Sequence, residues 1–238
     1  MGETGKAVVV SAHAGDFVWR AGGAIALHAE RGWDVLVVCL SLGERGESAQ
    51  LWRRGMPLEA IKARRKDEAL RAAEVLGARV ELLDLGDYPM RSTDDVFYRL
   101  VSIFRELRPA FVLTHSLQDP YNFDHPLASH ITQEARIVAQ AYGHEPEVPP
   151  LGAPPVFLFE PHQPEQCGWK PQVLLDISSV WEKKRAAFRV MAAQEHMWSY
   201  YERVALQRGA QAARNSDFKI THAEGYQRVF PEVSDSLQ

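Results

Sequence analysis

The residues with the clearest capacity for chemistry follow the first apolar run of the chain. His13 and Asp16 stand three residues apart, just after Ala7-Val8-Val9-Val10, where a buried strand is expected to open into a loop. Histidine and carboxylate are both zinc ligands, and a catalytic zinc takes three protein ligands and leaves one position open. The distant His125 would complete such a set. The alternative is a histidine that is hydrogen-bonded within a loop and binds no metal.

Polar side chains also follow three later apolar runs. They are Glu44, Arg45 and Glu47 after the second run, His115, Asp119, Asn122, Asp124 and His125 after the fourth, and Glu160 and His162 after the fifth. In open α/β sheets, ligands bind outside the carboxyl ends of the strands, so we expect these side chains to converge there. This convergence predicts an active site.

Each of these segments also has a purely structural interpretation. The run 43–47 is either a solvated turn or a flexible loop that carries a carboxylate base and a cation for an anionic substrate. The run 160–165 is either a rigid exposed loop or a loop whose prolines hold His162 at a set angle. His115, at the end of a strand, is a candidate for orienting a metal ligand rather than binding metal itself.

Alternating strands and helices are expected to position these residues. Strands are predicted at 6–12, 34–41, 79–85, 110–115, 156–160 and 172–177, and helices at 17–31, 58–76, 94–107, 125–142, 180–194 and 196–214. Gly22 and Gly23 are expected to let the first helix pack closely against the sheet. The alternation indicates an α/β, Rossmann-like three-layer fold, with a mostly parallel sheet and helices on both faces. The Pro-rich segment 143–155 is interpreted as a connector, and residues 1–238 are expected to form a single domain.

The composition is that of a soluble globular protein and disfavours several other classes. The 238 residues are 46% hydrophobic and 24% charged, with a net charge of -4. Lysines and arginines are dispersed, no apolar run approaches the roughly 20 residues of a membrane helix, and residues 1–6 lack the apolar region of a signal peptide. The two distant cysteines, Cys39 and Cys167, favour a reduced cytoplasmic protein without disulfides. We expect a homo-oligomer with neither nucleic acid nor a membrane as a partner.

The chain resembles the PIG-L/LmbE-like superfamily of zinc-dependent de-N-acetylases over essentially its whole length. The motifs that carry this resemblance are Ala12-His13-Ala14-Gly15-Asp16-Phe17, Gly22-Gly23, Ser41-Leu42-Gly43-Glu44, Leu76-Gly77, Asp124-His125, Asp176-Ile177, Lys183-Lys184 and Ala223-Glu224. The resemblance implies that His13, Asp16 and His125 bind Zn2+.

Two positions depart from the pattern of the deacetylases. The resemblance implies a general-base aspartate where this chain has Gly15, and a histidine that assists acid catalysis where it has Asn122. Hydrolysis of an amide needs an activated water and a proton for the departing amine. The metal ligands are present and both expected proton carriers are missing, so ordinary deacetylation is not expected.

Longer strings of the chain are similar to the 4-oxalomesaconate hydratases. These strings are residues 11–13, 16–30, 43–48, 84–91, 119–122 and 160–167. The resemblance implies addition of water to 4-oxalomesaconate, or to its enol tautomer 4-carboxy-2-hydroxymuconate. The product is 4-carboxy-4-hydroxy-2-oxoadipate, in bacterial gallate and protocatechuate degradation. Zinc would either stabilise the enolate oxygen or lower the pKa of the attacking water towards ~7.

Hydration of a double bond requires a base and an acid on opposite sides of it. Glu47 and His162 are the candidates, and the resemblance implies the same pair. The substrate would be a small tricarboxylate. The side chains expected to bind it are Arg45 as the first choice, then Arg20, Arg91 and Asn122.

Two rival functions are weighed against hydration. One is a zinc hydrolase with an atypical base, which would release acetate from an N-acyl sugar of the GlcNAc type. The other is a binding protein that kept the fold and lost the chemistry. Retention of the three metal ligands together with Glu47 and His162 argues against the second rival.

Overall fold

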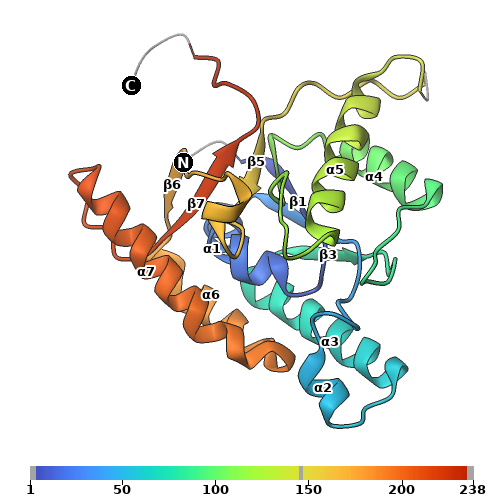
Figure 1. Ribbon diagram of the computed structural model, residues 1–238. Coiled ribbons are helices and arrows are strands. Elements are labelled where there is room, and N and C mark those ends of the chain that lie inside the picture. Colours follow the sequence, from blue (N-terminus) through green and yellow to red (C-terminus); the bar gives the residue numbers. More distant parts are fainter. Residues whose placement is uncertain (1–3, 145–146, 235–238) are drawn as a thin grey trace.

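Seven strands form one sheet at the centre of the computed structural model, which describes residues 4–144 and 147–234 (Figure 1). The strands are β1 (Lys6–Ser11), β2 (Asp34–Cys39), β3 (Arg79–Leu82), β4 (Phe111–Thr114), β5 (Val156–Phe159), β6 (Val173–Asp176) and β7 (Ala223–Arg228). Their order is β3-β2-β1-β4-β5-β7-β6. The first five strands in this order pair in parallel, and β7 runs antiparallel between β5 and β6.

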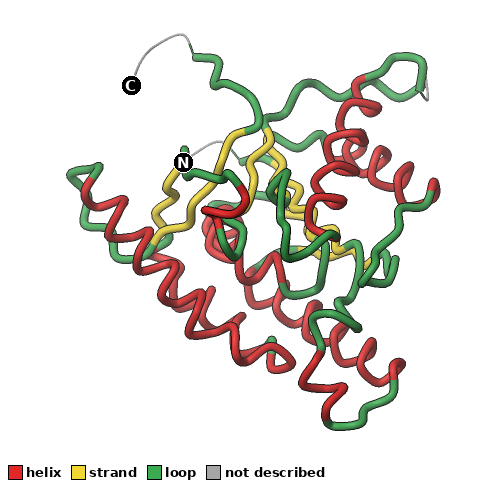
Figure 2. The backbone as a smooth tube through the Cα atoms, in the orientation of Figure 1, coloured by secondary structure: helices red, strands yellow, loops and turns green. Residues whose placement is uncertain are grey.

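Helices cover both faces of this sheet (Figure 2). They are α1 (Asp16–Glu30), α2 (Ala49–Arg53), α3 (Leu58–Leu76), α4 (Asp94–Leu107), α5 (Asp124–Gln140), α6 (Trp181–Val190) and α7 (Trp198–Arg214). On one face α1, α3 and α6 pack against one another, and on the other face α4 packs against α5. The expected three-layer α/β fold with a mostly parallel sheet is confirmed.

The central strands are apolar because both of their faces are buried. In β1, Val8 and Val10 face the core beneath α4 and α5, and Ala7 and Val9 face the core beneath α1. Strand β2 alternates between the same two cores. A strand covered by helices on both sides reads as a continuous apolar run, which is why the sequence pattern identified these two strands.

Helix ends follow local capping chemistry. Helix α3 ends at Gly77, whose φ of 82° lies in the left-handed region that favours glycine. Helix α4 begins after Thr93, whose side chain accepts a hydrogen bond from the backbone N–H of Val96 at 3.4 Å. Both helices have the bounds that the sequence predicts.

Several elements differ from the sequence-based expectation. The strand predicted at 79–85 ends at Leu82, and the helix predicted at 180–194 ends at Val190, followed by a 3-10 helix, η3 (Ala192–Met197). Helix α2 and strand β7 were not predicted. α2 has only five residues, and β7 (AEGYQR) has little apolar alternation. β7 gains its stability from two strand neighbours that are distant in sequence.

The close packing expected of Gly22 and Gly23 is seen in the structure, and it reaches the sheet at Gly23. A Cβ on Gly23 would lie 2.6 Å from the Ile177 side chain and 2.9 Å from Glu224 Oε1, and one on Gly22 would lie 3.2 Å from Lys184 Cγ. Gly23 therefore lets α1 approach β7 of the sheet, and Gly22 lets it approach Lys184 of α6.

The connector expected at 143–155 includes residues 145 and 146, which lie outside the described residues, as do residues 1–3 and 235–238. That residues 1–238 form a single domain stays a prediction. Within the described part of the chain, no helix combines the length and apolar character needed to cross a membrane.

Candidate metal centre and active site

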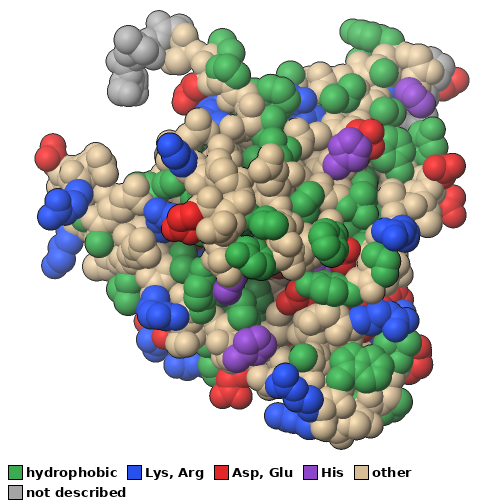
Figure 3. All heavy atoms as spheres, in the orientation of Figure 1, with side chains coloured by type: hydrophobic (Ala, Val, Ile, Leu, Met, Phe, Trp, Pro, Cys, Tyr) green, Lys and Arg blue, Asp and Glu red, His purple; other side chains and the backbone are tan. Residues whose placement is uncertain are grey.

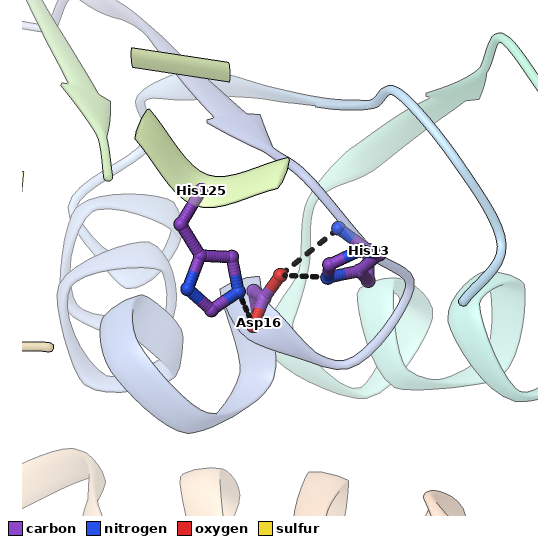
Figure 4. Close-up of side chains that lie close together, drawn as sticks. All are labelled: His13, Asp16 and His125. Atoms are coloured by element: carbon purple, nitrogen blue, oxygen red, sulfur yellow. Dashed lines mark hydrogen bonds and ion pairs between the residues drawn. The ribbon is translucent and has the colours of Figure 1, made fainter. Parts of the chain in front are cut away.

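The three predicted metal ligands meet at the carboxyl ends of β1 and β4. His13 and Asp16 come from the loop after β1 and the start of α1, and His125 from the first turn of α5 (Figure 4). One ligand atom from each of the three lies within 4.8 Å of the others, and all three side chains are buried. The convergence expected from the sequence is confirmed for this group.

The turn after β1 is shaped by its own polar groups. The Asp16 carboxylate accepts a hydrogen bond from the backbone N–H of His13 at 2.9 Å, and the Ser11 hydroxyl donates to the His13 carbonyl at 2.6 Å. Asp16 Oδ2 also lies 3.2 Å from His13 Nδ1, and Asp16 Oδ1 lies 3.5 Å from His125 Nε2. Asp16 is therefore aimed between the two imidazole rings.

A second carboxylate lies behind each histidine. Asp124 Oδ2 is 3.1 Å from His13 Nε2, and Asp119 Oδ2 is 2.8 Å from His125 Nδ1. Metal-binding histidines generally donate their second ring N–H to such a group, which fixes the tautomer and the ring orientation. We did not predict these pairings, although the position of Asp124 directly before His125 was a usable signal.

The charge distribution also fits a bound cation. Burial opposes a charged His13, but hydrogen bonds to Asp124 and Asp16 and the charge of Glu47 outweigh it and raise the pKa of His13 to about 10. The surplus of carboxylates thus holds a proton at this position. In addition, the buried His125 Nε2 has no hydrogen-bond partner in the structure. A donor set of two imidazoles and one carboxylate suits zinc, which would bind at these three residues.

His115 supports the site from behind. Its Nε2 accepts the backbone N–H of Ala12 at 2.9 Å, and its ring stacks on that of His125 with centroids 4.3 Å apart. Burial, followed by the nearby His125, lowers the pKa of His115 well below its usual value, which is consistent with a neutral acceptor at Nε2. His115 thus holds in place both the His125 ring and the segment after β1 that carries His13.

Glu47 reaches the same site from the loop between β2 and α2. Its Oε1 lies 3.8 Å from His13 Nδ1 and accepts a hydrogen bond from Asn122 Nδ2 at 3.3 Å. Its Oε2 accepts one from Gln194 Nε2 at 2.7 Å. By contrast Glu44, in the same loop, is buried beside Asp87 and is not in the metal group.

His162 is on the loop after β5, where it lines a pocket of about 310 Å³ together with Glu160, Tyr200 and Arg208. Its ring stacks on Tyr200 with centroids 4.0 Å apart, and the Tyr200 hydroxyl donates to its carbonyl. Burial and the charge of Arg20 lower the pKa of His162, while Asp119 and Glu47 oppose the shift. The charges of Asp119 and Glu47 therefore act on this imidazole, while its direct contacts are with Tyr200.

The three candidate arginines occupy different environments. Arg20 is buried, with Nη1 donating to the Glu160 carbonyl at 2.8 Å and Nε 3.5 Å from Asp16 Oδ1. Arg45 and Arg91 have exposed side chains. Figure 3 shows Lys and Arg scattered over this face rather than gathered in one patch.

The loops that carry the two exposed arginines are tied to the site through carboxylates. Asp87 accepts the backbone N–H of Arg45 at 2.8 Å, and Asp124 accepts that of Met90, next to Arg91, at 2.9 Å. Tyr88, Pro89, Asn122, Phe123 and Asp124 line a pocket of about 260 Å³ in this region. Arg45 and Arg91 are therefore attached to the site at its periphery, whereas Arg20 lies within it.

Sequence reasoning missed one residue that contacts this site, Gln194. It lies 147 residues from Glu47 in the sequence, on η3, and belongs to no motif. The only signal was indirect. Gly15 leaves space beside Asp16 that another group must fill.

Known proteins with similar sequences include a hydratase and deacetylases. The family model described as GlcNAc-PI de-N-acetylase (PIG-L) matches residues 8–136, which include all three metal-site residues. A 4-oxalmesaconate hydratase of Pseudomonas putida is 62% identical over 98% of this chain and 92% of its own length. A diacetylchitobiose deacetylase of Thermococcus kodakarensis is 28% identical over 83% of this chain and 73% of its own.

Solved structures give the same pattern. The 4-carboxy-2-hydroxymuconate hydratase of Pseudomonas putida superposes with a TM-score of 0.96 at 60% identity, covering 99% of this chain and 100% of that one. The N,N'-diacetylchitobiose deacetylase of Pyrococcus horikoshii shares the fold, with a TM-score of 0.78 at 21% identity over 95% and 84% of the two chains. The chain is a member of the PIG-L family, and within that family it is far more similar to the hydratase than to the deacetylases.

Proposed function

We propose that this protein is a zinc-dependent hydro-lyase that adds water to 4-oxalomesaconate, or to its enol tautomer 4-carboxy-2-hydroxymuconate. The product is 4-carboxy-4-hydroxy-2-oxoadipate, in gallate and protocatechuate degradation. The observation that carries the proposal is the pairing of a complete metal-ligand set with Glu47, 3.8 Å from His13, while Gly15 offers no carboxylate. The near full-length similarity to a hydratase supports the same reaction.

The reaction needs one proton to be taken up and one to be delivered. Glu47 accepts a proton from water as the new C–O bond forms at the alkene carbon that becomes the hydroxyl-bearing carbon of the product. The electron pair of the double bond moves towards the other alkene carbon, and a proton carried by His162 completes the C–H bond there. Glu47 then releases its proton to solvent and His162 takes one up, so that the sum is one water added across one double bond.

The metal ligands would hold zinc beside these two groups, where it supplies Lewis acidity for charge that develops on oxygen. The lowered pKa of His162 makes its protonated ring a strong proton donor. Negative charge on the carboxylates of a bound substrate opposes that lowering and favours the protonated ring in the complex.

Arg20, Arg45, Arg91 and Asn122 are the proposed contacts for the three carboxylates of the substrate. Guanidinium groups bind carboxylates in a planar, two-pronged geometry, which orients the substrate as well as attracting it. Arg20 is the deepest of the arginines, and its buried Nε has no hydrogen-bond partner in the structure. That atom faces Asp16 Oδ1 at 3.5 Å, beside the metal ligands.

A spectrophotometric hydration assay with 4-carboxy-2-hydroxymuconate tests the proposal. The expected result is loss of the conjugated absorbance, abolished by a chelator and restored by added zinc. An N-acetylated sugar, with acetate measured as product, serves as the competing substrate. Acetate release without hydration would overturn the proposal, and so would unchanged hydration after the metal has been removed.

A further inference from the structure

Gln194 connects the site to a buried ion pair. Its side chain is 3% exposed, its Oε1 accepts a hydrogen bond from Arg65 Nη2 at 2.6 Å, and its Nε2 donates to Glu47 Oε2 at 2.7 Å. A guanidinium can only donate and a carboxylate can only accept. The amide orientation is therefore fixed by its two neighbours, with oxygen towards Arg65 and nitrogen towards Glu47.

The anchor behind Gln194 is itself rigid. Arg65 is fully buried, and its Nη1 donates to Glu68 Oε2 at 2.9 Å while its Nε donates to the Leu42 carbonyl at 3.2 Å. Glu68 also accepts the backbone N–H of Ala193, the neighbour of Gln194, at 3.0 Å. The ion pair thus holds both the side chain of Gln194 and the backbone next to it.

Gly15 is what makes room for this arrangement. A Cβ built on Gly15 would lie 2.5 Å from Gln194 Oε1 and 2.6 Å from Trp19 Nε1, which is closer than real Cβ contacts. Any side chain at position 15 must therefore displace Gln194, Trp19 or both. The Gln194 amide occupies the volume that a side chain at position 15 would fill, so a carboxylate at position 15 and Gln194 in its present place exclude each other.

We propose that Gln194 is a positioning residue for Glu47, installed in the volume that Gly15 leaves free. Gln194 holds Oε2 of the carboxylate while Asn122 holds Oε1, and these two amides aim the group at the metal ligands. This inference rests on the proposed function, in which Glu47 receives the proton from water. It assigns to Gln194 an effect on the turnover step rather than on metal or substrate binding.

Gln194→Met preserves the length of the side chain and removes both hydrogen bonds. We expect kcat to fall roughly 10- to 100-fold, as for a displacement of about 1 Å in a reacting group. KM should change by less than about threefold, because catalytic positioning acts mainly on the transition state. Zinc content should be unchanged. Gln133→Met, on α5, is the matched control, since that amide donates to Ser129, one helical turn away, and is not in the metal group. Wild-type kcat in Gln194→Met would overturn the inference.

Gly15→Ala supplies a second arm, because its Cβ would meet Gln194 Oε1 and Trp19 Nε1 rather than act on Glu47 directly. It should lower kcat by a similar factor, and the double variant Gly15→Ala/Gln194→Met should be no worse than Gln194→Met alone. Losses that multiply would show that Gly15 acts by another route and would contradict the shared mechanism.

A stability measurement separates failure of this inference from failure of the proposed function. Gln194→Met should lower the denaturation midpoint in the wild-type background and lower it less in a Glu47→Ala background, since the broken contact is then already absent. This coupling does not depend on any substrate. If the wild-type protein fails to hydrate the dienol, the proposed function is wrong, and the coupling still tests the contact. Equal shifts in both backgrounds would contradict it.

Discussion

Two buried clusters of charge in this molecule have opposite characters. Glu224, on β7, is fully satisfied. Its Oε1 accepts hydrogen bonds from Gly23 N–H and Lys184 Nζ, and its Oε2 from Ala24 N–H and the Tyr226 hydroxyl, all at 2.6 to 2.8 Å. This carboxylate ties α1 to α6 and β7.

The metal group of His13, Asp16 and His125 is not satisfied by hydrogen bonds in this way. Asp16, Asp124 and Glu47 surround His13, and the buried His125 Nε2 and Arg20 Nε are left without hydrogen-bond partners. Burial of charge is common to both clusters and does not identify a function. What distinguishes the site is charge and hydrogen-bonding capacity that the protein itself does not use, and this capacity is available to a metal and a substrate.

The largest effect is expected from removing the charge of a metal ligand. Asp16→Asn should lose bound zinc and reduce hydration to background. Even partners behind the ligands typically contribute 10- to 100-fold in metal affinity, so a ligand itself should cost more than about 100-fold. Metal analysis of the purified variant, alongside circular dichroism to confirm folding, checks this. Full zinc occupancy in Asp16→Asn would remove Asp16 from the ligand set.

Glu47→Gln should separate catalysis from metal binding in the cluster around the metal group. It keeps the size of the side chain and removes its ability to take a proton, so kcat should fall roughly 10²- to 10⁴-fold. Zinc content should stay at the wild-type level, because Glu47 is not one of the three ligands. Steady-state kinetics and metal analysis on one preparation test both parts, and near-normal kcat would exclude Glu47 as the base.

Substitution in the Glu224 cluster should lower stability and leave activity nearly unchanged. Glu224→Ala leaves Lys184 buried without its partner, which should lower the free energy of unfolding by about 3–5 kcal/mol. Activity per folded molecule should change little. Denaturant unfolding gives the first quantity, with Glu30→Ala as a control, since the Lys183–Glu30 pair is solvent-exposed and should contribute less than about 1 kcal/mol. An equally small decrease in the free energy of unfolding in both variants would contradict a stabilising role for the Glu224 cluster.

Asp119→Ala probes the partner behind His125. Zinc affinity should fall roughly 10- to 100-fold, because the His125 ring loses the carboxylate that orients it. Competition with a chromogenic chelator measures the affinity directly. The cluster would be better described as structural if the affinity were unchanged while the melting temperature fell.

The smallest effect concerns pH. Burial, followed by the charge of Arg20, lowers the pKa of His162 below the ordinary histidine value of 6.5, so the folded protein favours the neutral ring. Below about pH 6.5 the unfolded chain binds this proton more readily, and stability is lost as pH falls through the lowered folded pKa. His162→Gln should flatten this part of the dependence between pH 7 and 5. His28 and His222, whose pKa values are also lowered, maintain a residual slope.

Local patterns predicted much of the fold. Continuous apolar runs predicted β1 and β2, and the helices predicted at 58–76 and 94–107 have the bounds of α3 and α4. Patterns of this kind depend on neighbours within a few residues. β7 was missed because its residues are ordered by pairing with β5 and β6, and η3 because Gln194 has a φ of -123° that interrupts the helical pattern.

By itself, the sequence determined the α/β alternation, the position of the metal group at the strand ends and the absence of a carboxylate at Gly15. Each of these is encoded in residue types at short spacing or in a motif. The tertiary structure decided the rest. It brings Asp124 and Asp119 to the second ring nitrogens of the two histidines. It also pairs Glu224 with Lys184 and places Gln194 in the space beside Gly15. Such contacts join groups up to 201 residues apart, as in the hydrogen bond from the backbone N–H of Gly23 to the Glu224 carboxylate. Only the packing of complete layers brings such groups within hydrogen-bond distance, so no local pattern in the chain records them.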